Sequence, residues 1–174
     1  LDQMPGGRIE PQQVIPLLNA SDDSLRGAAR WLVSRHTEWG GELSEWFRQQ
    51  LAGLPANSKQ ESNSTASEGL ESMLAEFSVH PAIQQLVSET LSDEKSSAAA
   101  KRLALRVMAQ AKLDESPPAW RKALAEVIAR DADQSLTELA VAAAQGLPIV
   151  ESAEDGLNQS LLKISNSDRS SQEL

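Results

Sequence analysis

The stretch that decides the fold is WGGELSEWF, residues 39–47. Its apolar residues stand at relative positions 0, +4, +7 and +8, a spacing that lines one face of an α-helix: Trp39, Leu43, Trp46 and Phe47. The same spacing returns in Trp120, Leu124, Val127 and Ile128, and in part in Ile83, Val87 and Leu91. An apolar helical stripe that recurs along one chain predicts stacked helical repeats.

Other segments predict the helices that pair with these. Their apolar residues also fall at helical spacing: Leu25, Ala28, Ala29 and Leu32; Leu70, Met73, Leu74 and Phe77; the run 99–111; Leu136, Leu139, Ala140 and Ala143; and Leu157, Leu161 and Ile164. Capping residues such as Asp22 and Asp133, Pro81 in a first turn, and Ser116 before Pro117 indicate where helices begin. The sequence has no sustained alternation of apolar and polar residues, which is the pattern that predicts a strand.

Composition excludes several classes of protein. The chain has 174 residues, 40% of them hydrophobic, which is enough for a core. The net charge of -9 and the lack of a basic run argue against nucleic-acid binding. There is no cysteine, hence no disulfide and no thiolate metal site. Apolar runs such as 139–144 fall well short of the ~20 residues that span a bilayer, so we expect no membrane insertion.

The repeat period defines the expected domain. Corresponding residues of the first helices recur at about 37 residues: Leu25, Leu70, Ala100, Leu136 and Leu174. We therefore expect a single repeat domain over 1–174. Residues 56–66 are almost free of apolar side chains and predict a mobile polar loop within it, in preference to a linker between two domains. Because 168–174 looks like the start of a fifth repeat, we expect a fragment of a longer chain.

The run VIPLL at 14–18, followed by DDSLRGAA at 22–29, resembles the signature of HEAT repeats. The resemblance implies an all-α, right-handed α-α superhelix (a HEAT/armadillo-like solenoid) of about four helix pairs. Lys101 and Thr137 stand where Arg26 would align, so the family's charged ladder is incomplete. Residues 30–40 are similar to HEAT-like segments of large bacterial proteins that also carry propeller dehydrogenase-like and cytochrome c modules. That similarity implies an exported or periplasmic location and redox chemistry in neighbouring domains; without it, the cytoplasm is expected.

Few side chains are candidates for chemistry. His36 and His80 both fall at helix junctions, where an imidazole that bonds the last helix carbonyls is a better explanation than a metal pair or a haem ligand. Three of the four tryptophans follow the apolar stripes and predict core packing, whereas Trp31 is expected partly at the surface. We expect no catalytic residue, no cofactor and no metal.

The remaining candidate is a surface. On the second helix of each pair, the face opposite the apolar stripe carries Glu45 and Arg48, then Lys122 and Glu126. In HEAT-type arrays this layer usually lines the concave side that binds partners. The sequence therefore favours a non-catalytic protein-interaction module or a structural spacer, whose partner is another protein or another domain of the same chain. The alternative is an enzyme that handles a chromophore or tetrapyrrole, as in HEAT-type bilin lyases. Apolar ends would also favour self-association.

Overall fold

The computed structural model describes residues 9–55, 65–130, 133–148 and 156–161. All regular elements in these ranges are helical and none is a strand, so the prediction of an all-α fold is confirmed. The long helices are α2 (Asp23–Ser34), α3 (Gly40–Ala52), α4 (Thr65–Glu76), α5 (Pro81–Ser92), α6 (Ala98–Gln110), α7 (Pro118–Arg130) and α8 (Gln134–Gly146). Shorter elements are α1 (Pro11–Val14), the 3-10 helices η1 (Ile15–Asn19), η2 (Thr37–Trp39) and η4 (Phe77–Val79), and the helical residues 156–161.

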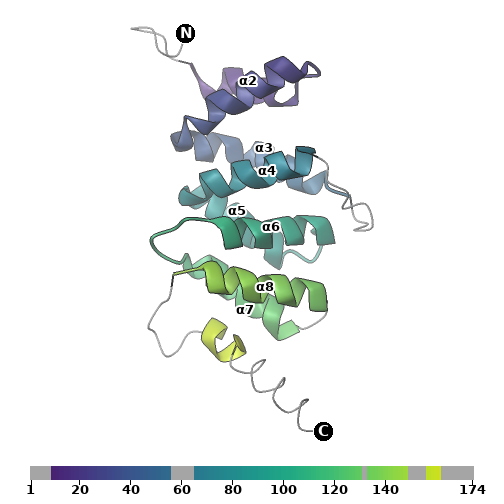
Figure 1. Ribbon diagram of the computed structural model, residues 1–174, viewed down its shortest axis with the longest axis vertical. Coiled ribbons are helices and arrows are strands. Elements are labelled where there is room, and N and C mark those ends of the chain that lie inside the picture. The colour runs from purple at the N-terminus through teal and green to yellow at the C-terminus, as the bar shows by residue number, and fades with distance from the viewer. Residues whose placement is uncertain (1–8, 56–64, 131–132, 149–155, 162–174) are drawn as a thin grey trace.

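The helices stack in two layers along the long axis of the molecule (Figure 1). The front layer holds α2, α4, α6 and α8, in this order, and the back layer holds α3, α5 and α7. Within the layers α4 packs on α6, α6 on α8, α3 on α5 and α5 on α7. Contacts of α5 with α6 and of α7 with α8 join the two layers. Each helix therefore touches mainly its neighbours in the stack.

The apolar stripes form the core between the layers. Every member of the stripe over residues 39–47, which runs from η2 into α3, is buried. The stripe residues of α5 are also buried, and so are those of α7 except for the half-buried Val127. The buried stripe residues are Trp39, Leu43, Trp46, Phe47, Ile83, Val87, Leu91, Trp120, Leu124 and Ile128. The stripe predicted from residues 39–47 is confirmed. Trp120 is fully enclosed, and its indole N–H donates a hydrogen bond of 2.8 Å to the carbonyl of Gln84 on α5.

Helix α2 buries only part of the face predicted for it: Ala29 is buried and Leu32 packs half-buried against the core. Ala29 and Val33 of α2 are buried, but Leu25 is 44% exposed and Ala28 is also exposed. The reason is that α2 packs on α1, η1 and η2, and none of the described elements covers its outer side. The segment VIPLL differs too: its last four residues lie in the 3-10 helix η1.

The helix boundaries follow the capping residues, with one correction. Asp22 and Asp133 cap α2 and α8 as predicted, through carboxylates that accept backbone N–H bonds. Ser116 was expected to cap α7, but Pro117 takes that position: its carbonyl accepts from the N–H of Arg121 at 3.2 Å. A residue that precedes proline is disfavoured in the α region, and Pro117 precedes Pro118. The helix therefore begins one residue later than expected.

The polar segment between α3 and α4 is shorter than predicted. Helix α4 begins at Thr65, so residues 65 and 66 belong to it rather than to the loop expected over 56–66. Residues 56–64 lie outside the described part of the chain, as do Ile164 and residues 168–174, on which the prediction of a truncated repeat was based.

Ion pairs connect successive helices of the front layer. Arg106 of α6 lies 3.8 Å from Glu71 of α4, whose other carboxylate oxygen accepts a 2.5 Å hydrogen bond from Gln110. Arg102 of α6 lies 4.0 Å from Asp133, the cap of α8. These two arginines, and not Lys101, which aligns with Arg26 in the sequence, form the ion pairs that connect α6 to its neighbours.

Candidate functional site

The four predicted surface residues lie on the back layer, and residues of α5 connect three of them, Glu45, Arg48 and Glu126, into a row. Glu45 and Arg48 of α3 form an ion pair at 3.5 Å, and Arg48 also reaches Glu89 of α5 at 3.2 Å. Three residues further along α5, the hydroxyl of Ser92 donates a 3.4 Å hydrogen bond to Glu126 of α7. We call these residues the polar row: Glu45, Arg48, Glu89, Ser92 and Glu126. It crosses three consecutive helices of the back layer.

Sequence reasoning missed the middle of the row, although the signal was present. Glu45 stands six residues after Trp39, the first residue of its stripe, and Glu126 stands six residues after Trp120. The same offset from Ile83 gives Glu89. Because α5 carries only the partial stripe, the sequence pattern does not mark its polar face as clearly as those of α3 and α7. The repeat register therefore places one glutamate per helix at equivalent positions.

Lys122, the fourth predicted residue, is exposed on α7 and forms no ion pair within the described residues. Glu126, one helical turn away, is half-buried. Glu45, Arg48 and Glu89 remain largely accessible, with side chains 67%, 52% and 43% exposed. The row is thus a solvated surface of mixed charge, whose exposed ion pairs are individually weak.

His80 caps a helix, but at the opposite end from the one predicted. His80 precedes Pro81 and is therefore extended, with ψ of 128°. Its Nδ1 accepts from the N–H of Ala82 at 3.2 Å, so it caps the start of α5 rather than the end of the preceding helix. Its ring also packs against Gly40: a Cβ added there would lie 2.6 Å from the Cβ and Cγ of His80. His36 pairs with Glu38 at 2.7 Å and stacks on Trp39 at a centroid distance of 4.2 Å.

The tryptophans divide as expected. Trp39, Trp46 and Trp120 are at most 7% exposed, whereas Trp31 is 57% exposed and carries the guanidinium of Arg35 at 5.2 Å from its ring centroid. Trp46 is fixed in place, because its indole N–H donates to Asn19 at 3.2 Å.

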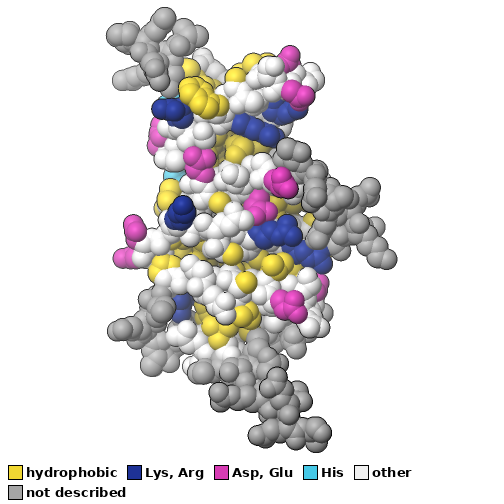
Figure 2. All heavy atoms as spheres, viewed as in Figure 1, with side chains coloured by type: hydrophobic (Ala, Val, Ile, Leu, Met, Phe, Trp, Pro, Cys, Tyr) yellow, Lys and Arg dark blue, Asp and Glu magenta, His cyan; other side chains and the backbone are white. Residues whose placement is uncertain are grey.

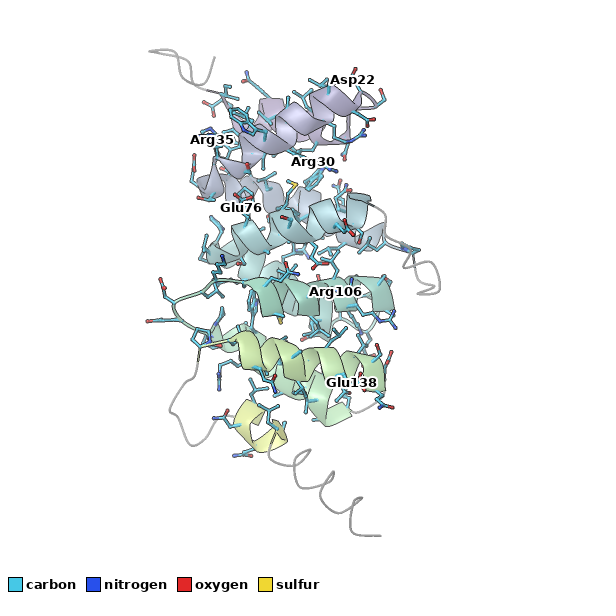
Figure 3. All side chains as sticks on the ribbon, viewed as in Figure 1. Asp22, Arg30, Arg35, Glu76, Arg106 and Glu138 are labelled. Atoms are coloured by element: carbon cyan, nitrogen blue, oxygen red, sulfur yellow. The ribbon has the colours of Figure 1, made fainter. Side chains whose placement is uncertain are left out.

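A cleft of about 260 Å³ opens between α2, α3 and α4. Arg30 comes from α2, Trp46 and Gln50 from α3, and Leu70 and Met73 from α4. Figure 3 shows Arg30 reaching into the space between α2 and α4. Its Nε is buried and has no hydrogen-bond partner among the described residues. This is the one place in the front layer, as far as the chain is described, where a buried guanidinium nitrogen lacks an acceptor.

Two further findings concern other classes of site. No group of three or more His, Cys, Asp or Glu side chains is placed to hold a metal ion within the ranges that the structure covers. No helix in the same ranges is both long and apolar enough to cross a bilayer. Figure 2 shows acidic and basic side chains interspersed over the described part of the front layer.

Comparison of the chain with family models, with curated proteins and with solved structures gives no match.

Proposed function

We propose that this chain is a non-catalytic protein-interaction or structural spacer module of a larger bacterial protein. Its partner would be another protein or another domain of the same chain. The observation that carries the proposal is the polar row, a solvated surface of mixed charge that continues from α3 through α5 to α7. A row built at equivalent repeat positions offers many weak contacts along one direction, which is how stacked repeats bind extended partners.

Two features support a HEAT-like superhelix as the scaffold. Successive helices alternate between two layers, and each contacts mainly its neighbours, as in α-solenoids. Ion pairs link the first helices of successive pairs, from Glu71 through Arg106 and from Arg102 to Asp133. The right hand of the superhelix, the HEAT assignment, the redox-module parent and the exported or periplasmic location remain parts of this proposal.

The tetrapyrrole alternative gains no support from the cleft. Pockets for drug-sized ligands span roughly 300–1,000 Å³, and the cleft between α2, α3 and α4 measures about 260 Å³. A tetrapyrrole is larger than most drug-sized ligands. No described residue favours this function over the interaction module.

The test is affinity capture from a soluble extract of the source organism with two charge-swapped baits. One bait carries Glu45→Lys, Arg48→Glu, Lys122→Glu and Glu126→Lys. The matched control carries the same number of swaps away from the polar row, on α4, α6, the α6–α7 connection and α8: Glu76→Lys, Lys101→Glu, Lys112→Glu and Glu138→Lys. Both sets leave the net charge unchanged. A partner that the native and control baits retain and the first variant loses supports a binding face; loss by both variants or by neither contradicts it.

Self-association is a separate proposal. It rests on apolar side chains of η1 and α2 that are exposed. Leu17, Leu25 and Trp31 are 36%, 44% and 57% exposed on η1 and α2. Light scattering of the chain with Leu25→Ser and Trp31→Ser checks this directly. We expect the native chain to form dimers at high concentration and the variant to stay monomeric. A native chain that is monomeric throughout would contradict the proposal.

A further inference from the structure

We propose that the cleft between α2, α3 and α4 binds a carboxylate attached to an apolar body about the size of one amino-acid residue. This inference does not rest on the proposed function, because Glu45, Arg48, Lys122 and Glu126 do not line the cleft. It follows from three properties of the lining: a buried guanidinium nitrogen without an acceptor, a fixed apolar wall, and the size of the space.

The guanidinium of Arg30 supplies the recognition element. Its Nε–H is buried, and in the described part of the chain no oxygen accepts from it. A buried donor without an acceptor is costly, and an oxyanion that pairs with the Nε–H relieves that cost. Arginine presents parallel N–H groups that match the two oxygens of a carboxylate. The other arginines of the front-layer helices, Arg26, Arg102 and Arg106, already have acidic neighbours.

The guanidinium of Arg30 lies close to helix α4 at Gly69. A Cβ added at Gly69 would lie 3.1 Å from Nη1 and 3.7 Å from Cζ of Arg30. The guanidinium therefore lies against the backbone of α4, at a distance that a larger residue would disturb.

The apolar part of the lining fits an apolar body. Trp46, Leu70 and Met73 line the cleft and are each 7% exposed. The indole N–H of Trp46 is already bonded to Asn19, so Trp46 offers its ring to a ligand and not its donor. The amide of Gln50 lines the same space and has no hydrogen bond to described residues, so it is a second polar contact.

The volume limits the ligand. About 260 Å³ lies below the range of roughly 300–1,000 Å³ typical of pockets for whole small molecules of drug size. The cleft therefore fits one amino-acid-sized group. That group can be the end or one acidic residue of a polypeptide, or a free small carboxylic acid. With a net charge of -9 the chain does not attract anions in general, so retention of a carboxylate reports on this local site.

NMR titration of the full 174-residue chain tests the proposal. The probe is N-acetyl-L-leucine, and its neutral amide, N-acetyl-L-leucinamide, is the matched ligand. We expect the acid to shift the Nε–H signal of Arg30 and the amides of Gly53, Gly69 and Met73 saturably, with a dissociation constant on the order of 1 mM. The amide should bind at least tenfold more weakly. Equal shifts with acid and amide, or the same shifts with inorganic phosphate alone, would overturn the proposal.

Variants locate the binding in the cleft. Arg30→Gln should abolish the shifts, and Arg30→Lys, which keeps the charge but loses the Nε–H, should weaken binding several-fold. Arg35→Gln, on the same helix but against Trp31, should bind as the native chain does. Retained binding by a folded Arg30→Gln variant would overturn the proposal. If that variant fails to fold, unchanged binding by Arg30→Lys would overturn it instead.

The same titration separates the two sources of the carboxylate. A peptide that ends in leucine should shift the same signals as the free acid. Binding at least tenfold tighter than the free acid would assign the site to a polypeptide, because the flanking residues then add contacts. Equal affinity would assign it to a small carboxylic acid. Shifts from the peptide that avoid the cleft signals would contradict the proposal.

Discussion

The front layer contains two kinds of junction. From α4 to α8 the helices pack directly on one another, and ion pairs span both steps. At the end of α8 the packing is so close that a Cβ on Gly146 would lie 2.9 Å from the carbonyl oxygen of Ala109 on α6. Between α2 and α4 the helices make few direct contacts; a cleft separates them, and Arg30 lies in it without an acidic partner among the described residues.

The difference shows how the first helix pair, α2 and α3, is attached to the rest of the stack. Its connection to the rest of the stack runs mainly through the back layer, where α3 packs on α5, Gly40 touches His80, and Arg48 reaches Glu89. The later pairs are held through both layers. Elements with fewer buried contacts open at lower free energy, so α2 should be the least stable long helix of the described stack.

The largest expected effect lies in the closely packed part. Trp120→Ala removes a fully buried indole and leaves the carbonyl of Gln84 without its donor. We expect a loss of about 3–5 kcal/mol in the free energy of unfolding, measured by urea denaturation. Trp31→Ala is the control. Because Trp31 is 57% exposed, its substitution should change the free energy of unfolding by about 0.5 kcal/mol or less, apart from any loss due to its contact with Arg35.

The next effect tests the attachment of the first pair through the back layer. Gly40→Ala places a methyl group 2.6 Å from Cβ and Cγ of His80, so α3 and α5 must separate. We expect it to destabilise the protein by about 1–3 kcal/mol in thermal unfolding. Gly41→Ala is the matched control, because its Cβ would meet His80 only at 3.6 Å. A Gly40→Ala variant as stable as Gly41→Ala would refute the close approach.

A pair of glycine substitutions compares the two junctions directly. Gly146→Ala brings a methyl group to 2.9 Å from a backbone oxygen that cannot turn away, and should cost about 1–2 kcal/mol. Gly69→Ala meets only the flexible end of Arg30 at 3.1 Å. It should be neutral or gain up to about 1 kcal/mol from helix propensity. Chemical denaturation of both variants measures the difference, and the reverse order would contradict the contrast between the junctions.

The smallest effect concerns the arginines. Arg106→Gln breaks the pair with Glu71 and should cost about 0.5–1 kcal/mol, less at high salt. Arg30→Gln should leave the stability of the ligand-free chain unchanged, because it removes no ion pair of the described residues. The check is urea denaturation at low and high salt; a salt-dependent loss for Arg30→Gln would show that Arg30 has an acidic partner.

The sequence was sufficient for the parts of the fold that repeat. The spacing of Trp39, Leu43, Trp46 and Phe47 predicted a buried stripe, and the buried residues of α3, α5 and α7 follow it. Periodicity failed at Leu25, because it identifies an apolar face but not whether a neighbour covers that face. It also failed at Ser116, where the restriction that Pro118 imposes on Pro117 outweighs the capping preference of serine.

The candidate sites were predictable to different degrees. Glu45, Arg48 and Glu126 of the polar row were named from the sequence, whereas Glu89 was missed, although it has the same offset from its stripe as Glu45. The cleft could not be predicted from the sequence, because it depends on the separation of α2 from α4, and no local pattern encodes the distance between two helices. Arg30 reads in sequence as an ordinary charged residue; only its buried Nε and the nearby Gly69 distinguish it.

Native-state hydrogen exchange tests the central claim, that the first helix pair is held through one layer and the later pairs through both. The account predicts that the amides of residues 29–33 in α2 exchange through local openings, at a free energy about 2 kcal/mol or more below that of residues 103–108 in α6. Exchange of both helices at one common free energy would contradict it, because α2 would then open only when the whole stack unfolds.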